Sequence, residues 1–157
     1  MGMMSFLSSL FGNEPETAKQ LASRSAELAD DADEVKGLNF RTAIEAHQRW
    51  KVRLADYVAG TSTERLDRQV VSRDDQCALG KWIHGSGGDQ FREMEGFRQL
   101  QDRHAYFHVC AGKILGLAQD GHKDAALQEL QKGEYARISL DVVRDLATLY
   151  LSLQQRR

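Results

Sequence analysis

The chain has 157 residues, of which 41% are hydrophobic and 28% charged, and its formal net charge is −2. This length allows one domain, or one domain with a short extension, whose core needs no disulfides. Lysine and arginine are spread along the chain, which argues against nucleic acid as a partner. Pro15 is the single proline, and this scarcity, together with many Ala, Leu, Gln, Glu and Arg residues, predicts an all-helical fold.

The first 37 residues are predicted to precede the main domain. Residues 1–13 lack the basic start and cleavage site of a secretory signal and are too short to span a membrane. We expect a frayed, flexible start there, with a small amphipathic anchor as the alternative. Pro15 suits the first turn of a helix and Gly37 ends it, so residues 14–37 are assigned to an N-terminal helix and 38–157 to the bundle.

The next segments place one histidine in the core and one cysteine at a helix start. A helix over residues 38–58 has apolar residues at helical spacing, so His47 on the same stripe faces inward. That stripe consists of Phe40, Ala43, Ile44, His47, Trp50, Leu54 and Tyr57. Short helices are predicted over 63–71 and 76–83. The second has Cys77 in its first turn, where backbone N–H groups and the helix dipole favour a thiolate.

Gly85–Gly88 predict a break, after which the pattern indicates a long helix over 89–118. His104 and His108 fall on its buried stripe, with Phe97, Leu100, Phe107, Ala111 and Leu115. A short helix over 124–131 and a last helix over 134–154 complete the chain. The last helix turns inward Tyr135, Ile138, Val142, Leu146, Leu149 and Leu153. We therefore predict a four-helix-bundle-like, all-α domain with a short helical insertion carrying the cysteine and an extra N-terminal helix.

His47, Cys77, His104 and His108 are candidate ligands of one metal ion. Positions 104 and 108 lie one helical turn apart and point the same way. Burying two imidazoles without hydrogen-bond partners would cost roughly several kcal/mol of stability, and a metal ion gives both a partner. Three imidazoles and one thiolate form a tetrahedral set suited to zinc. The spacing alone does not establish that all four residues converge, since a lone inward histidine is ordinarily a core residue.

Several competing interpretations are weaker. Cys110 comes two residues after His108, about 200° around the helix, and is expected to point away from the pair. His84 and His122 lie in polar, glycine-flanked stretches and are expected on the surface. A di-iron site of the hemerythrin type lacks the carboxylates it needs, and four protein ligands would close the site to hydrolytic chemistry. We therefore expect no enzyme. A disulfide between the two cysteines stays open, although the missing secretory signal favours a reducing cytoplasm.

The local sequence around these positions is similar to a known family. His47 with Trp50, the run Cys77-Ala78-Leu79-Gly80-Lys81-Trp82, and the run from His104 to His108 followed by Ala111-Gly112 resemble the chemoreceptor zinc-binding (CZB) domain. The resemblance covers roughly Leu38 to Leu153. It implies a cytoplasmic helical-bundle sensor, commonly a homodimer, that binds zinc through the four candidate residues and works with a chemoreceptor or a diguanylate cyclase. The chain shows no signalling hairpin or GGDEF-type segment, so we expect a stand-alone protein or an excised domain.

The expected function is a sensor of zinc, of oxidants such as hypochlorous acid, or of both, with Cys77 as the redox-sensing ligand. Its output is expected to be chemotaxis or cyclic-di-GMP signalling. The alternative is a structural zinc bundle that serves as a dimerisation or adaptor module. Trp50, Asp75 and Trp82 are candidates for supporting contacts around the metal, although core packing and helix capping explain them equally well. Neither nucleic acid binding nor membrane contact is expected.

Overall fold

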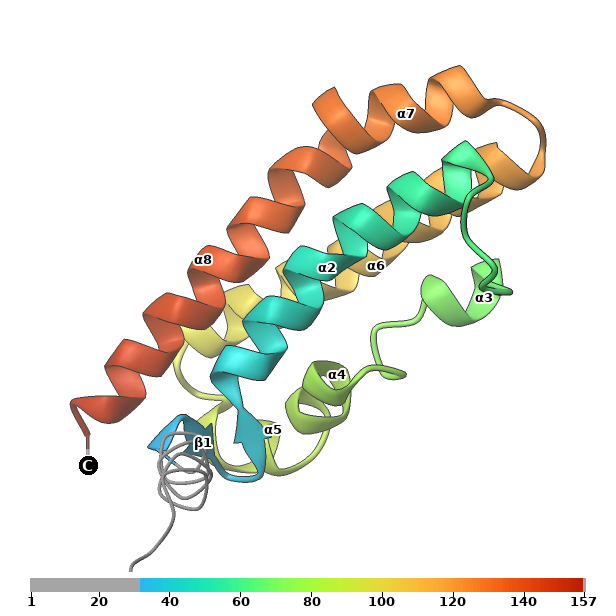
Figure 1. Cartoon of the computed structure of the whole chain (residues 1–157). Helices are drawn as coiled ribbons and strands as arrows, with labels where there is room; N and C mark the ends of the chain where they lie inside the picture. Colours follow the sequence, from blue (N-terminus) through green and yellow to red (C-terminus); the bar gives the residue numbers. More distant parts are fainter. Residues whose placement is uncertain (1–31, 157) are drawn as a thin grey trace, which may run out of the picture. The chain divides into compact units, whose positions relative to one another are not determined.

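The computed structural model describes residues 32–156. The segment predicted for residues 1–13 and the helical part over 14–31 lie outside the described residues. Glu34–Arg157 form one compact unit, which contains the helical bundle. The predicted all-α bundle is confirmed for this unit, since long helices form it and its two strands have only two residues each (Figure 1).

The bundle begins with a β-hairpin, which corrects the prediction of helix up to Gly37. Strand β1 (Glu34–Val35) pairs antiparallel with β2 (Leu38–Asn39). Lys36 and Gly37 form the two-residue turn, both with positive φ angles of 51° and 86°, as hairpins of this length require. Val35 and Leu38 are buried by this turn. The hairpin therefore contributes Val35 and Leu38 to the core.

Four helices make the body of the bundle, and their predicted inner faces are largely confirmed. They are α2 (Phe40–Ala59), α6 (Glu95–Gln119), α7 (Lys123–Lys132) and α8 (Glu134–Gln154). Asn39 caps α2 by accepting a hydrogen bond from the Thr42 amide, and Gly60 ends it in a left-handed conformation. The stripes expected inside on α6 and α8 are buried throughout. On α2, Ile44, Trp50 and Tyr57 are only half-buried.

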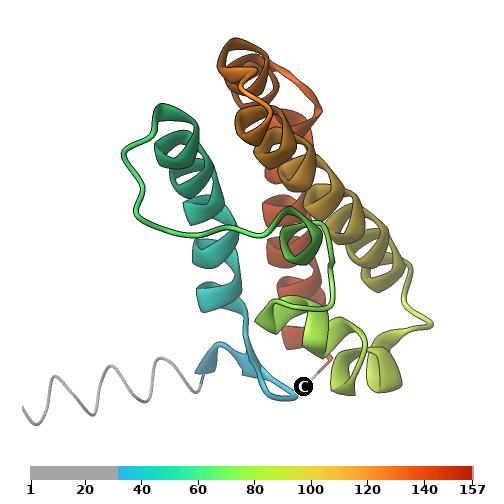
Figure 2. The same ribbon diagram turned by 90° about the vertical axis from the view of Figure 1, so that its right-hand side faces the viewer.

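Short helices connect α2 to α6, and here the sequence prediction needs correction. Helix α3 (Arg68–Val71) is shorter than expected, and α4 (Ala78–Ile83) agrees with the prediction. Helix α5 (Ser86–Phe91) covers the expected glycine break and the predicted start of the long helix, so that α6 begins at Glu95 and not at residue 89. Gly87 and Gly88 lie inside α5, and Gly87 packs so closely against the Trp82 indole that a Cβ would lie 2.4 Å from a ring carbon. Figure 2 shows the connection after α2 arching outward and back before it reaches α3.

The structure contains no membrane-crossing helix in the part of the chain that it describes. None of the helices there is both long enough and apolar enough to cross a bilayer.

Candidate metal centre

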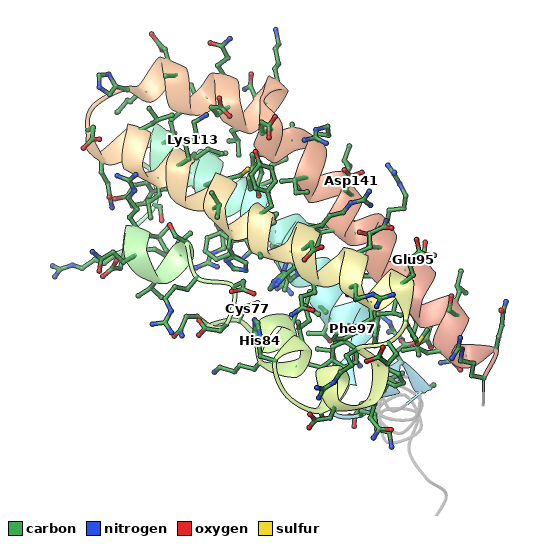
Figure 3. All side chains as sticks on the ribbon, turned by 180° about the vertical axis from the view of Figure 1, so that it is seen from behind. Cys77, His84, Glu95, Phe97, Lys113 and Asp141 are labelled. Atoms are coloured by element: carbon green, nitrogen blue, oxygen red, sulfur yellow. The ribbon has the colours of Figure 1, made fainter. Side chains whose placement is uncertain are left out.

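Three separate elements bring His47, Cys77, His104 and His108 together. His47 projects from α2, the two other histidines project from α6, and Cys77 is the residue that caps the N-terminus of α4. Cys77 and His84 mark the two ends of α4 (Figure 3). One potential ligand atom from each of the four lies within 4.8 Å of the others. The convergence that the spacing left open is therefore present in the fold.

The closest contacts join the sulfur to the paired imidazoles. Cys77 Sγ lies 3.3 Å from His104 Nε2 and 3.6 Å from His108 Nε2, and the two Nε2 atoms are 3.1 Å apart. All three histidines are buried and Cys77 is half-buried. Nitrogen and sulfur atoms this close in a water-poor site form a typical soft donor set for zinc.

Backbone carbonyls orient two of the imidazoles. His47 Nδ1 donates to the Ala43 carbonyl at 2.7 Å, and His108 Nδ1 donates to the Val71 carbonyl at 2.8 Å. With Nδ1 as the protonated nitrogen, each Nε2 presents a lone pair. His47 Nε2 is buried and has no hydrogen-bond partner among the described residues. Leaving such an atom unsatisfied costs about 1–3 kcal/mol, so the residues fit a bound metal ion.

Burial also keeps the imidazoles in the neutral form that a metal needs. Desolvation by burial is the main cause that lowers the pKa of His47 to about 4 and that of His104 to about 2, and it lowers the pKa of His108 as well. The pKa of the Cys77 thiol differs from the sequence prediction, because burial raises it. Hydrogen bonds from backbone N–H groups, that of Gly80 above all, lower the pKa but do not outweigh burial. In the absence of a metal the helix start does not by itself make this residue a thiolate.

Gly80 holds the Cys77 segment in position. Its amide donates to Cys77 Sγ at 3.3 Å. A Cβ on Gly80 would lie 1.6 Å from the Asp74 carbonyl oxygen, a backbone atom that cannot yield without moving the chain. The glycine in the run Cys77-Ala78-Leu79-Gly80 is therefore needed for the close approach that places the sulfur beside the histidines.

Replacing Gly80 with alanine is expected to lower the affinity for zinc at least about tenfold, in the range seen when a supporting contact of a metal ligand is lost. The reason is that the backbone around Asp74 must shift and carry Cys77 with it. Zinc affinity is measured by competition with a chromogenic chelator. Gly96→Ala is the control, since a Cβ there meets nothing within 4 Å. Equal zinc affinities for the two variants would contradict the assignment.

Trp50, Asp75 and Trp82, the candidates for supporting contacts around the metal, interact with residues other than the four clustered ones. The Trp50 ring lies under the Arg53 guanidinium, whose carbon is 4.0 Å from the ring centre. Asp75 accepts two hydrogen bonds from Arg73, at 3.0 and 2.8 Å. The Trp82 indole donates to the Val35 carbonyl at 3.1 Å. The contacts that do orient the ligands come from the backbone of Ala43, Val71 and Gly80, which leave little signal in a sequence.

The competing histidines and the second cysteine behave as predicted. His84 is exposed and pairs with Asp74 at 2.7 Å, and His122 is exposed at the start of α7. Cys110 lies buried on α6 outside the cluster, and both cysteines are free thiols, so the disulfide that stayed open is absent. The four-residue cluster contains no carboxylate, which agrees with the argument against a di-iron site.

Comparison with known proteins shows what the metal-centre segment is similar to. Residues 47–115 match the family model described as the chemoreceptor zinc-binding domain, and this segment contains all four clustered residues. The chain is also 25% identical over 97 residues to "Diguanylate cyclase DgcZ" of Escherichia coli (strain K12), a match that covers 61% of this chain and 33% of that protein. No solved structure is significantly similar. The family resemblance and the zinc cofactor are thereby confirmed.

Proposed function

We propose, from the match of residues 47–115 to the chemoreceptor zinc-binding domain, that this chain is a regulatory zinc sensor whose ligands are His47, Cys77, His104 and His108. The observation that carries the proposal is the convergence of their four donor atoms within 4.8 Å. The bare Nε2 atom of buried His47 supports it, because a metal ion gives that atom the partner it lacks. The protein would act as a binding module and not as an enzyme.

Cys77 is the ligand that we expect to respond. The histidines are fixed on the long helices α2 and α6, and two of them are also held by carbonyls. Cys77 instead precedes a six-residue helix in the connection between these helices, and it is half-buried. When bound, zinc keeps the sulfur deprotonated and nucleophilic. A change at this sulfur therefore acts on the one ligand that lies outside the long helices.

An oxidant such as hypochlorous acid supplies such a change. The Cys77 thiolate sulfur attacks the chlorine atom, so that an S–Cl bond forms, the Cl–O bond breaks and hydroxide leaves. Hydroxide then displaces chloride from the sulfur, and thiolate and hypochlorous acid together yield sulfenic acid and chloride. A sulfenic acid lacks the anionic sulfur that makes a thiolate a strong ligand. The α4 segment would then be free to move away from the two histidines of α6. Free zinc is the second proposed signal, with metal occupancy drawing the same segment onto the bundle.

The output is proposed to be cyclic-di-GMP signalling or chemotaxis in the cytoplasm. The similarity to a diguanylate cyclase supports the first of these, and the family description supports the second. Because the chain spans about a third of the length of that cyclase, the partner that receives the signal would be supplied by another segment or another protein. We further propose that the chain works as a homodimer, so that a local change at Cys77 is transmitted between two copies.

The test replaces Cys77 with serine, which keeps the size but removes the thiolate. We expect zinc affinity to fall by more than about 100-fold. Losing a residue that only hydrogen-bonds a metal ligand costs roughly 10–100-fold, and losing the ligand itself should cost more. We also expect loss of the zinc release that hypochlorous acid causes in the wild type. Cys110→Ser is the matched control and should release zinc normally. If the Cys77 variant binds zinc and releases it on oxidation as the wild type does, the proposed role of this residue is wrong.

The alternative is a structural zinc bundle that serves as a dimerisation or adaptor module. The burial of all three histidines favours it, because closed four-ligand sites often stabilise a fold. Chelation separates the two functions. A structural site should lose most of its helicity when a chelator removes the metal, whereas a sensor should keep its helices and change only around α4. Circular dichroism and hydrogen exchange measure these two outcomes.

A further inference from the structure

A cavity of about 730 Å³ opens directly onto the cluster. One wall is the face of α2 that carries Arg49, Trp50 and Arg53, and the other wall is the connection from Arg65 to Cys77, which arches away from α2 in Figure 2. Of the four clustered residues, Cys77 and His108 line this cavity while the two other histidines do not. The cavity therefore gives a small molecule a path to the sulfur.

The charged side chains of this cavity are mainly positive. Arg49, Arg53 and Arg65 line it, and Asp67 is the only carboxylate among the described lining residues. That carboxylate is occupied as the cap of α3, where it accepts from the Gln69 amide at 2.7 Å. The remaining walls are largely apolar, with Trp50, Leu66, Val70 and Val71 among them. An excess of positive charge beside low-dielectric walls attracts and concentrates small anions.

Two of the three guanidinium groups are available to a ligand. Arg53 is held in place, because it binds Glu64 through two hydrogen bonds of 3.1 and 3.0 Å and lies over Trp50. Arg49 makes only a 3.5 Å contact to the Glu45 carbonyl, and Arg65 has no ion-pair partner in the described part of the chain. Both are exposed at the cavity mouth. An anion that enters would meet these two side chains before it meets the sulfur.

We propose that this arginine cavity is an anion-selective access site, through which small anionic electrophiles reach Cys77 faster than neutral molecules of similar size. The proposal rests on the proposed function for its biological use, because there Cys77 is the responding ligand. It adds the chemical class of reactant that the site selects, to which hypochlorite, the conjugate base of hypochlorous acid, belongs. The volume lies within the range of small-molecule sites, so a reactant of one or two aromatic rings fits. Charge focusing of this kind raises association rates by about 10- to 1000-fold and is screened by salt.

The experiment compares two aromatic disulfides as probes on the zinc-loaded full chain in a Cys110→Ala background, which leaves a single thiol. One probe is the dianion 5,5′-dithiobis(2-nitrobenzoate) and the other is neutral 4,4′-dithiodipyridine. In both reactions the Cys77 sulfur forms a new S–S bond with one sulfur of the probe, the bond within the probe breaks, and the other half leaves as a thiolate. The ratio of the two second-order rate constants is the readout, because the thiolate fraction of Cys77 cancels in it.

The Arg49→Gln/Arg65→Gln double variant is expected to lower this ratio about tenfold, and high salt should lower the wild-type ratio to a similar value. Lys51→Gln is the matched control, since Lys51 is exposed on the same helix but does not line the cavity. A ratio that is equal in all three proteins, or rates that do not depend on probe concentration, would overturn the proposal. These outcomes are independent of whether Cys77 governs zinc release, which the serine variant tests separately.

Discussion

Replacing His104 with alanine is expected to lower the affinity for zinc by more than about 100-fold, because a ligand is lost and not only a residue that supports a ligand. His104 is fully buried, and its Nε2 atom is the one closest to both Cys77 Sγ and His108 Nε2. Its removal leaves three donors and an apolar gap at the centre of the cluster. Competition with a chelator measures the affinity, and the helical circular dichroism signal shows whether the fold persists.

His122→Ala is the matched control for this variant, since His122 is exposed and lies outside the cluster. It should bind zinc as the wild type does. An His104→Ala protein that binds zinc with unchanged affinity would show that the metal is held elsewhere. A variant that loses zinc and also loses its helicity would favour the structural alternative, because the metal would then be needed for the fold itself.

The second large effect concerns acid and the zinc-free protein. The folded-state pKa values of His47 and His104, about 4 and about 2, lie below the ordinary 6.5 because burial disfavours their charged forms. In the unfolded chain these groups take up protons as the pH falls below 6.5, while the folded protein does not. Their contribution to stability is thus fully present above that pH and is lost as the pH falls toward the folded-state values.

As the pH falls from about 6.5 to about 5, each of the two histidines is expected to lower the free energy of unfolding by about 1.6 kcal/mol, or by roughly 3 kcal/mol together. This is a large share of the roughly 5–15 kcal/mol that stabilises an ordinary domain. Urea unfolding of the chelator-treated protein at the two pH values measures it, in a range that lies above the ordinary carboxylate pKa values. His104→Leu should reduce the loss by about half. A zinc-free protein whose free energy of unfolding is the same at both values would show that these histidines are not kept neutral by burial.

The two predictions address different properties of the same residues. Loss of His104 tests whether the imidazole is a ligand, whereas acid tests how strongly the fold excludes water from it. In the zinc-loaded protein the acid effect takes another form, because protons and the metal compete for the same nitrogen atoms. A sensor based on this cluster is therefore expected to release zinc more readily as the pH falls.

Residue spacing alone was sufficient to predict the helical faces of the bundle and the paired histidines. Apolar residues at helical spacing predicted the buried stripes of α6 and α8, and these stripes carry His104 and His108 inward. Helical geometry alone fixes that relation, since residues four apart always share a face. Local runs around His47 and Cys77 also resembled a zinc-binding family, which the matched segment confirms.

How these local elements meet could not be predicted from residue spacing, because it depends on the folded arrangement. Cys77 reaches the histidines because Gly80 lets the chain pass closely over Asp74, and the imidazoles of His47 and His108 are oriented by carbonyls. The arginine cavity likewise lies between segments distant in the sequence, and the hairpin at Glu34–Asn39, although local, accepts hydrogen bonds from Trp82 and Ser86. Backbone acceptors and cavities have no residue pattern of their own, because they depend on where folded segments lie in space.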